Sequence, residues 1–287
     1  MKIHLKKIKN NKITFILSSG FNLFFHTLNL YGQLGGASKT YQNTSQFKKR
    51  DKKEKKQLLE RKEIIEIYSV LCKENIFEAE EVISFMKKYR LEVIFRNEWK
   101  DFYKEYWKNN YKSIKKEFTI LCSYEWEKTI LDMEKLTGYI FKPNIIIIPV
   151  EGCGDTAYYS LEENLSIGGF KSGGFRHEGF HLLLRKQWAE NKRIKKILEK
   201  HKDHKTKEWG TNTLERLEQG IVVSLDSILR EMPDYYVKKY FEGCYVGNLY
   251  KYFYKKIKFW YENGCREELT DLLYIIIKDE EQNIFHS

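Results

Sequence analysis

The chain has 287 residues, enough to bury a sizeable core in one large domain or two closely packed lobes. Hydrophobic residues make up 42% of it and charged residues 32%, a balance that excludes an intrinsically disordered chain. The formal net charge of +11 allows nucleic acid or anionic membranes as partners, but no nucleic-acid-binding motif accompanies it. The one dense basic run, at 48–56, also contains acids and is typical of a solvated helix start.

The 5 cysteines lie far apart and form no CxxC pair, which excludes a disulfide framework and a cysteine zinc finger and fits a reducing compartment. The basic stretch 1–12 and the apolar residues after it have the outline of a signal peptide, but small and polar residues at 18–22 interrupt the apolar run. We therefore expect a cytoplasmic protein that retains this segment. No later stretch approaches the length and hydrophobicity of a membrane span.

In chain order, the first 30 residues predict two short strands, because apolar residues alternate near positions 3–5 and 13–17, and then a short apolar helix. Residues 31–46 are small and polar and predict a loop. From about 52 to 137, apolar residues recur at three- and four-residue spacing, which predicts a run of helices.

The pattern changes at Pro143. The β-branched run NIIIIPV (144–150) predicts a buried strand, and NLSIGGF (164–170) predicts an edge strand within a glycine-rich stretch. A helix carrying FRHEGFHLLL (175–184) follows. Beyond it we expect a short helix and loop across 191–211, and then helices at about 212–231, 234–262 with a break near Gly243–Gly247, and 266–282. The predicted fold class is α+β, mainly helical, with a small sheet just before the histidine helix.

The segment HEGFH (177–181) carries the most specific chemical signal in the chain. Residues four apart share one face of a helix, so His177 and His181 can hold one metal ion together. Glu178 lies about 100° round the helix, where it borders the ion and can accept a proton from a metal-activated water. Neutral imidazole suits Zn²⁺, and a catalytic zinc keeps three protein ligands and a water. The alternative is a surface helix with two histidines, but the flanking apolar residues predict burial.

The helix predicted at 212–231 offers a third ligand. At about 100° per residue its apolar residues form one stripe, and Glu218 falls inside that stripe. Glu215 falls at the edge of the stripe and Asp226 just outside it. A carboxylate on a buried face is costly unless it is paired or bound to a metal. Glu218 is therefore the predicted third ligand and Glu215 the reserve. The alternative is that Glu218 pairs with a buried Arg or Lys.

Together HEGFH, Glu218 and the strands before them resemble the gluzincins, zincin metallopeptidases with HExxH on one helix and a glutamate ligand on a later one. The resemblance covers roughly residues 140–250 and implies a zincin-like fold. We expect an N-terminal lobe at 1–190, with the strands and the histidine helix, and a helical C-terminal lobe at 191–287 that carries the third ligand.

The resemblance also assigns roles. It implies that Glu178 is the catalytic base and that His177, His181 and Glu218 bind Zn²⁺. It implies that NLSIGGF pairs with an extended peptide or protein substrate by strand addition.

Zincin relatives often supply an oxyanion donor from the C-terminal lobe. Tyr245, in GCYVGNLY (243–250), resembles the tyrosine that relatives use, although it sits one place closer to the glycine. Tyr236 and His204 are the alternatives. Arg176, beside His177, is a candidate for a substrate contact or a surface position.

The chain departs from the family pattern in three places. Many members have glutamate directly before glycine in the ligand helix, whereas here Gln219 precedes Gly220. The interval between His181 and Glu218 is longer than in the thermolysin-type and aminopeptidase-type enzymes, so neither subfamily is supported. The aminopeptidase signature GxMEN is absent, which argues against a strict N-terminal exopeptidase.

The sequence therefore predicts a hydrolase, a zinc metallopeptidase that cleaves peptide bonds. One alternative is a catalytically inactive zincin-like binding protein. A second is a basic, helical nucleic-acid-binding protein, for which the sequence offers only its net charge. A nucleophilic pair of Cys153 and His177 ranks last, because nothing in the sequence places the two together.

Overall fold

The computed structural model describes residues 4–7, 13–34, 57–141, 144–151, 157–160, 164–170, 172–201, 213–243, 246–265 and 267–285. It divides into two compact units. The N-terminal unit comprises Met1–Tyr124 and Lys142–Glu178, and the C-terminal unit comprises Glu125–Phe141 and Gly179–Ser287. The division falls inside the histidine helix, and 125–141 belongs with the later residues. The lobe boundary at 190 stays a prediction.

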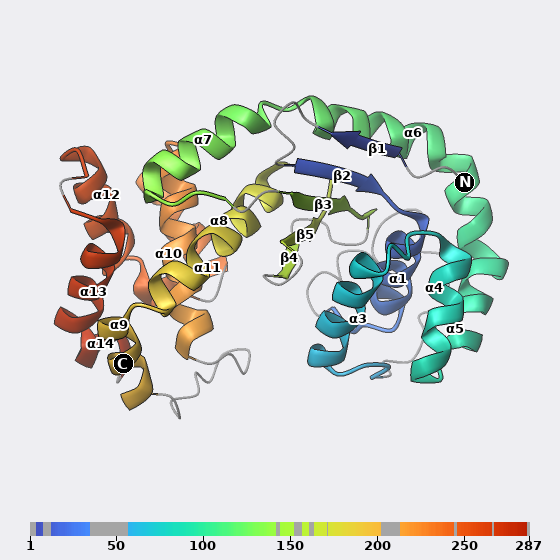
Figure 1. The fold of residues 1–287 in the computed structure, drawn as a ribbon, viewed down its shortest axis with the longest axis horizontal. Coiled ribbons are helices and arrows are strands. Elements are labelled where there is room, and N and C mark those ends of the chain that lie inside the picture. Colours follow the sequence, from blue (N-terminus) through green and yellow to red (C-terminus); the bar gives the residue numbers. More distant parts are fainter. Residues whose placement is uncertain are drawn as a thin grey trace. The chain divides into compact units, whose positions relative to one another are not determined.

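The N-terminal unit contains a five-stranded sheet in the order β1-β2-β3-β5-β4 (Figure 1). Its strands are β1 (His4–Lys7), β2 (Ile13–Leu17), β3 (Ile145–Pro149), β4 (Ala157–Ser160) and β5 (Leu165–Gly168). The central strands β2, β3 and β5 run parallel, whereas β1 and β4 pair antiparallel at the two sides. The predicted strands at the N-terminus and at 144–150 are thereby confirmed.

The prediction that NLSIGGF forms an edge strand is wrong. Strand β5 lies between β3 and β4, so that Ile167 is opposite Ile148 on one side and Tyr158 on the other. All four residues of β5 are buried, as expected for an interior strand. The outer strand on this side of the sheet is β4, whose four residues are too few to show an alternating pattern in a glycine-rich stretch.

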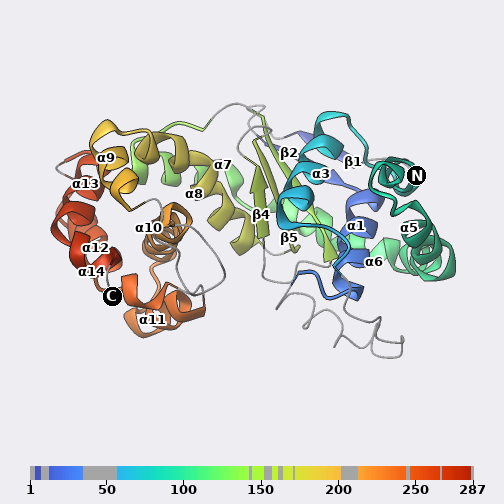
Figure 2. The same ribbon diagram turned by 90° about the horizontal axis from the view of Figure 1, so that it is seen from below.

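The described residues of the N-terminal unit also form helices around this sheet. They are α1 (Ser19–Leu30), α3 (Arg61–Lys73), α4 (Ala79–Phe85), α5 (Glu92–Glu98) and α6 (Lys104–Ser123), with a 3-10 turn at Met86–Tyr89 and a π-helical turn at Trp99–Tyr103. Helix α6 contacts β2, and in Figure 1 it lies above β1 while α1 lies below the end of β2; Figure 2 gives the view from below. Every residue of α1 is buried, because α4 and α5 pack on it as well.

The start of α1 is docked tightly against the residues that precede α4. The Ser18 hydroxyl accepts a hydrogen bond from the Phe21 N–H and donates one to the Phe77 carbonyl at 2.6 Å. The Gly20 N–H donates to the same carbonyl at 2.8 Å. A Cβ atom at Gly20 would lie 2.6 Å from Val82 Cγ2 and 2.9 Å from the Phe77 carbonyl oxygen. Only glycine therefore fits where these two backbones meet.

The C-terminal unit is helical in its described residues. Its elements are α7 (Trp126–Thr137), α9 (Lys192–Lys200), α10 (Thr213–Leu229), α11 (Asp234–Gly243), a 3-10 turn at Gly247–Leu249, α12 (Tyr254–Glu262), α13 (Leu269–Asp279) and α14 (Glu281–Phe285). The predicted helices, including the break after Gly243, are confirmed. Helix α10 contacts α7, α11 and α12, so it lies at the centre of the unit.

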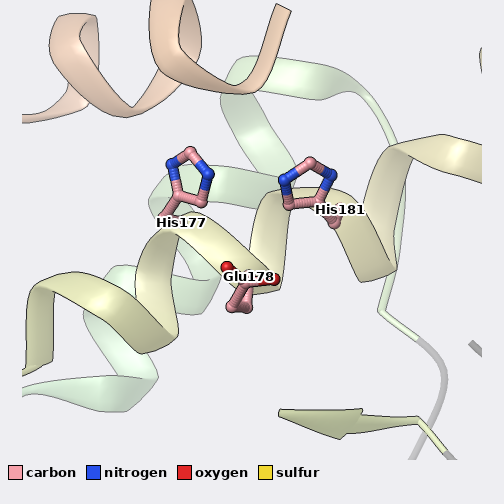
Figure 3. Close-up of side chains that lie close together, drawn as sticks. All are labelled: His177, Glu178 and His181. Atoms are coloured by element: carbon pink, nitrogen blue, oxygen red, sulfur yellow. The ribbon is translucent and has the colours of Figure 1, made fainter. Parts of the chain in front are cut away.

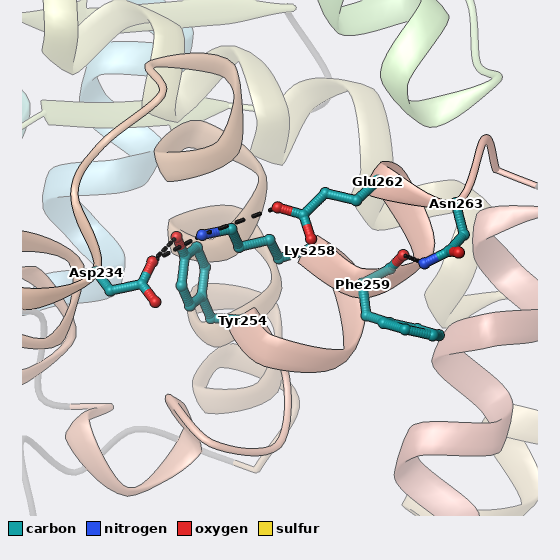
Figure 4. Close-up of polar contacts among 6 residues, drawn as sticks. All are labelled: Asp234, Tyr254, Lys258, Phe259, Glu262 and Asn263. Atoms are coloured by element: carbon teal, nitrogen blue, oxygen red, sulfur yellow. Dashed lines mark hydrogen bonds and ion pairs between the residues drawn. The ribbon is translucent and has the colours of Figure 1, made fainter.

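The start of α11 is held to α12 by a polar contact (Figure 4). The Asp234 carboxylate accepts hydrogen bonds from the Tyr254 hydroxyl at 3.0 Å and from Lys258 Nζ at 2.8 Å. The hydrogen bond from Lys258 is the main reason why the pKa of Asp234 lies below its usual range. The Asp234 side chain is 60% exposed, so this contact contributes at most about 1 kcal/mol and apolar packing dominates.

The structure confirms a mainly helical α+β protein with a small sheet before the histidine helix. In the part of the chain that the structure describes, none of the helices combines the length and the apolar character that crossing a membrane requires.

Replacing Gly20 by alanine should destabilise the protein by about 1–3 kcal/mol, because the added methyl group overlaps Val82 and two backbone carbonyls. Urea denaturation of the purified chain measures this loss. Gly243→Ala is the matched control, since a Cβ there meets no atom within 4 Å. Equal stabilities of the two variants would contradict the close approach at Gly20.

Glu151, directly after β3, is a buried acid with incomplete hydrogen bonding. Its backbone N–H donates to Asn22 Oδ1 at 2.9 Å, and the Tyr106 hydroxyl donates to its Oε1 at 3.1 Å. Its Oε2 is buried and has no hydrogen-bond partner among the described residues. Burial raises the pKa of Glu151 to about 7, against the lowering effect of the Tyr106 hydrogen bond.

The raised pKa makes stability depend on pH. The folded carboxyl holds its proton to a higher pH than the unfolded one. The protonated carboxyl therefore contributes fully to the free energy of unfolding below pH ~4.5, and this contribution is lost as the pH rises through about 7. Because glutamine does not ionise, Glu151→Gln should not lose stability in this way. Its free energy of unfolding should rise relative to wild type, by up to about 3 kcal/mol, as the pH increases from 4.5 to 8. Urea titrations across this range measure it, with the exposed Glu105→Gln as control. A pH-independent difference between wild type and Glu151→Gln would contradict the assignment.

Candidate metal site on helix α8

Helix α8 (Ser172–Ala189) carries the histidines and is buried on nearly all sides. Its large apolar residues point in several directions and are shielded from solvent: Phe175, Phe180, Leu183, Leu184 and Trp188. A helix that is apolar all round is typical of the inside of a protein. The predicted burial of the motif is confirmed, so its polar side chains need partners.

The structure brings His177, Glu178 and His181 together on this helix. Their side chains are all buried, and the possible ligand atoms of the three lie within 4.8 Å of one another. Figure 3 shows the two imidazole rings projecting side by side, while Glu178 leaves the helix from an adjacent side. Two imidazoles and one carboxylate at this spacing can hold a divalent metal ion, or can place the carboxylate beside an ion held by the two rings.

Gly179, the residue between Glu178 and Phe180, lets α8 approach its neighbours closely. A Cβ there would lie 3.1 Å from Met133 Cε of α7 and 3.7 Å from Phe141 Cζ. Phe141 and Met133 therefore form a wall against this part of α8, and a side chain at position 179 would displace them.

Glu218, the predicted third ligand, lies on α10 and is 1% exposed. Its Oε1 is 2.7 Å from Nδ1 of His181, but the group of possible ligand atoms within 4.8 Å of one another comprises His177, Glu178 and His181 and does not include Glu218. The reserve, Glu215, is only partly buried. Asp226 was expected just outside the buried stripe but is fully buried, with contacts to Arg230 and Tyr240. Helix α10 is buried over more of its circumference than its apolar stripe indicates, because it lies at the centre of the unit.

The contact with Glu218 distinguishes the two nitrogens of His181. An ionised carboxylate only accepts hydrogen bonds, so Nδ1 carries the proton in this pair. Nε2 is then an acceptor, whose lone pair can face a metal ion; the side-chain amide of Gln219 lies beside it and can donate to it only through its NH2 group. Ligand histidines commonly donate their other N–H to a carboxylate, and the arrangement of His181 and Glu218 matches this pattern.

Sequence reasoning missed two residues beside Glu218. Arg185 Nε lies 3.4 Å from Glu218 Oε2, and Gln219 contacts His181. The alternative that Glu218 pairs with a buried Arg or Lys is thus met in part, because Glu218 contacts both Arg185 and His181. A signal for Arg185 was present: it follows His181 by four residues and therefore shares its helix face.

The remaining candidates are less informative. Tyr245, His204 and Cys153 lie outside the described residues. Tyr236 is 50% exposed on α11, where its ring lies 4.0 Å from that of Tyr235. Arg176 contacts the Tyr124 hydroxyl at 3.5 Å.

In comparisons with known proteins, no family model, no curated protein and no solved structure matches the chain. The interpretation of the site therefore rests on its own residues.

Proposed function

We propose that this protein is a zinc-dependent peptide hydrolase. The observation that carries the proposal is the convergence of His177, Glu178 and His181, all buried and with ligand atoms within 4.8 Å of one another, on one helix. Burying three such groups is costly unless they bind an ion or one another. A zincin-like arrangement of the sheet and α8 is part of the proposal.

The residues fit Zn²⁺ by their chemistry. Imidazole nitrogens and carboxylate oxygens are typical zinc ligands, and two histidines with one glutamate is a ligand set of catalytic zinc sites. Glu218 is the proposed third ligand, because it is buried against His181 and supplies negative charge. On binding, its Oε1 would exchange the hydrogen bond to Nδ1 for a bond to the metal. If Glu218 instead keeps that hydrogen bond, it supports His181 from outside the ligand set.

In the proposed reaction, bound zinc would polarise the substrate carbonyl and lower the pKa of a water. Glu178 accepts the proton of the attacking water and passes it to the amine that leaves. Tyr245 remains the proposed donor to the oxyanion. An extended peptide would pair with β4, the outer strand, rather than with NLSIGGF as predicted.

One observation favours the second candidate, a catalytically inactive zincin-like binding protein. The carboxylate of Glu218 is engaged by Arg185 as well as His181, an arrangement that satisfies its charge without a metal. Metal content and hydrolysis separate the two candidates.

Glu178→Gln should retain zinc but lose at least about 100-fold in peptide hydrolysis, because the base is gone while the ligands remain. His177→Ala should lose both. Zinc is measured by mass spectrometry of the purified protein, and hydrolysis with a pool of quenched fluorescent peptides. Glu190→Gln, an exposed glutamate just beyond α8, is the control and should match wild type.

Two outcomes would contradict the proposal: wild-type protein that takes up no zinc, or a Glu178→Gln variant that cleaves the peptides as fast as wild type. Zinc bound without hydrolysis would favour the inactive binding protein.

Glu218→Ala should weaken zinc binding by more than about 100-fold, beyond the 10–100-fold typical of residues that only support a ligand. Glu215→Ala should leave the affinity unchanged, because Glu215 is only partly buried and is not among the grouped ligand atoms. Competition with a chromophoric chelator measures both affinities. If Glu215→Ala weakens zinc binding more than Glu218→Ala does, Glu215 is the third ligand and the assignment of Glu218 is wrong.

A further inference from the structure

We propose that Arg185 is a positioning residue that fixes the orientation of Glu218, so that this carboxylate acts through Oε1 alone. The inference rests on the proposed metal site and assigns a role to a residue outside its ligand set. It follows from the two ends of one carboxylate: Oε1 lies 2.7 Å from Nδ1 of His181, and Oε2 lies 3.4 Å from Nε of Arg185.

Helix geometry makes Arg185 the natural partner. His177, His181 and Arg185 follow one another at four-residue intervals, so they line one face of α8. Glu218 on α10 contacts the last two of them. A single buried side chain of α10 thus contacts α8 at two points, through the close approach of Oε1 to His181 and through the ion pair of Oε2 with Arg185, although Oε2 makes no hydrogen bond with the described residues. The ion pair favours one orientation of the carboxylate.

Burial strengthens the interaction between Arg185 and Glu218. The Glu218 side chain is 1% exposed and that of Arg185 is 26% exposed, so the carboxylate is shielded from water while the guanidinium reaches the surface. An ionised carboxylate without a partner in such a place is strongly disfavoured. The guanidinium supplies the opposite charge at Oε2 and leaves Oε1 for His181 or for the ion that His181 binds.

The orientation has a consequence for a bound ion. A carboxylate that presented one oxygen would occupy one coordination position of the ion and would leave another for water or substrate. Without Arg185, the carboxylate of Glu218 would be less restricted in its orientation. Loss of such an outer partner typically weakens metal binding by 10–100-fold.

The test uses the purified full-length protein with Zn²⁺ and with Co²⁺, whose visible spectrum reports the number of ligands. Arg185→Ala and Arg185→Gln should each bind Zn²⁺ about 10–100-fold more weakly and should change the intensity and position of the Co²⁺ bands. Arg185→Lys should restore part of the affinity, because it returns the charge without the planar group.

Arg230→Ala is the matched control. It also removes an arginine from a buried carboxylate of α10, since Arg230 Nη1 lies 3.5 Å from Asp226 Oδ2 and Asp226 is fully buried. A general loss of packing would weaken metal binding in both Arg185→Ala and Arg230→Ala. If Arg185 acts by positioning Glu218, Arg230→Ala should keep the wild-type affinity for Zn²⁺ and the wild-type Co²⁺ spectrum.

Wild-type affinity and an unchanged Co²⁺ spectrum in Arg185→Ala and Arg185→Gln would overturn the role of Arg185 and leave the metal site intact. An equal loss in Arg230→Ala would overturn it too. If wild-type protein binds neither ion, the proposed function fails together with this inference. If Arg185→Ala does not fold, Arg185→Gln and Arg185→Lys decide, because both keep much of the side chain.

Discussion

A buried charged side chain is costly unless a group of opposite charge or a hydrogen-bonding partner lies beside it. This constraint determines which side chains pack against helix α10 in the C-terminal unit. The carboxylate of Glu218 is buried on the central helix, so α8 meets it with an imidazole and a guanidinium from one face. The same helix must present two histidines at that face while packing apolar residues elsewhere. The packing of α8 against α10 and the proposed chemistry thus depend on the same side chains.

The N-terminal unit buries polar groups in several ways. Helix α1 is buried throughout; its Ser18 cap and Asn22 hydrogen-bond to backbone groups, whereas His26 lies 3.8 Å from the buried carboxylate of Glu98. Asn22 bonds both the carbonyl of Pro149 and the N–H of Glu151, which joins α1 to the end of β3. Glu151 Oε2 has no hydrogen-bond partner among the described residues, and burial raises the pKa of this carboxyl to about 7. Glu218 and Glu151 therefore differ: Glu218 is paired with Arg185, whereas burial raises the pKa of Glu151.

Much of the fold could be predicted because its elements carry strong local patterns. Helix α10 repeats apolar residues with the helical period, and β3 is a β-branched run after a proline. Strand β4 could not be predicted, because it is held by pairing with β5 rather than by a pattern of its own, and that pairing turned the expected edge strand into an interior one. For the site, the spacing of His177 and His181 was readable, as was the burial of Glu218. The four-residue spacing of His181 and Arg185 placed both on one face of α8, but that Glu218 meets this face depends on how α8 and α10 pack, which no spacing along one helix shows.

The residues of the candidate site are separated by very different distances along the chain. His177 and His181 become neighbours as soon as one turn of helix forms, whereas His181 and Glu218 are separated by 37 residues. A bond through a shared ion between those two would therefore act as a cross-link that closes a loop containing α9, and it would oppose the conformational entropy of the unfolded chain. The helix alone can supply a weak two-nitrogen site, but only the folded unit can supply the third contact. Metal uptake and the final docking of α10 would then be one cooperative event, with the ion serving as a staple of the tertiary structure as well as a reagent.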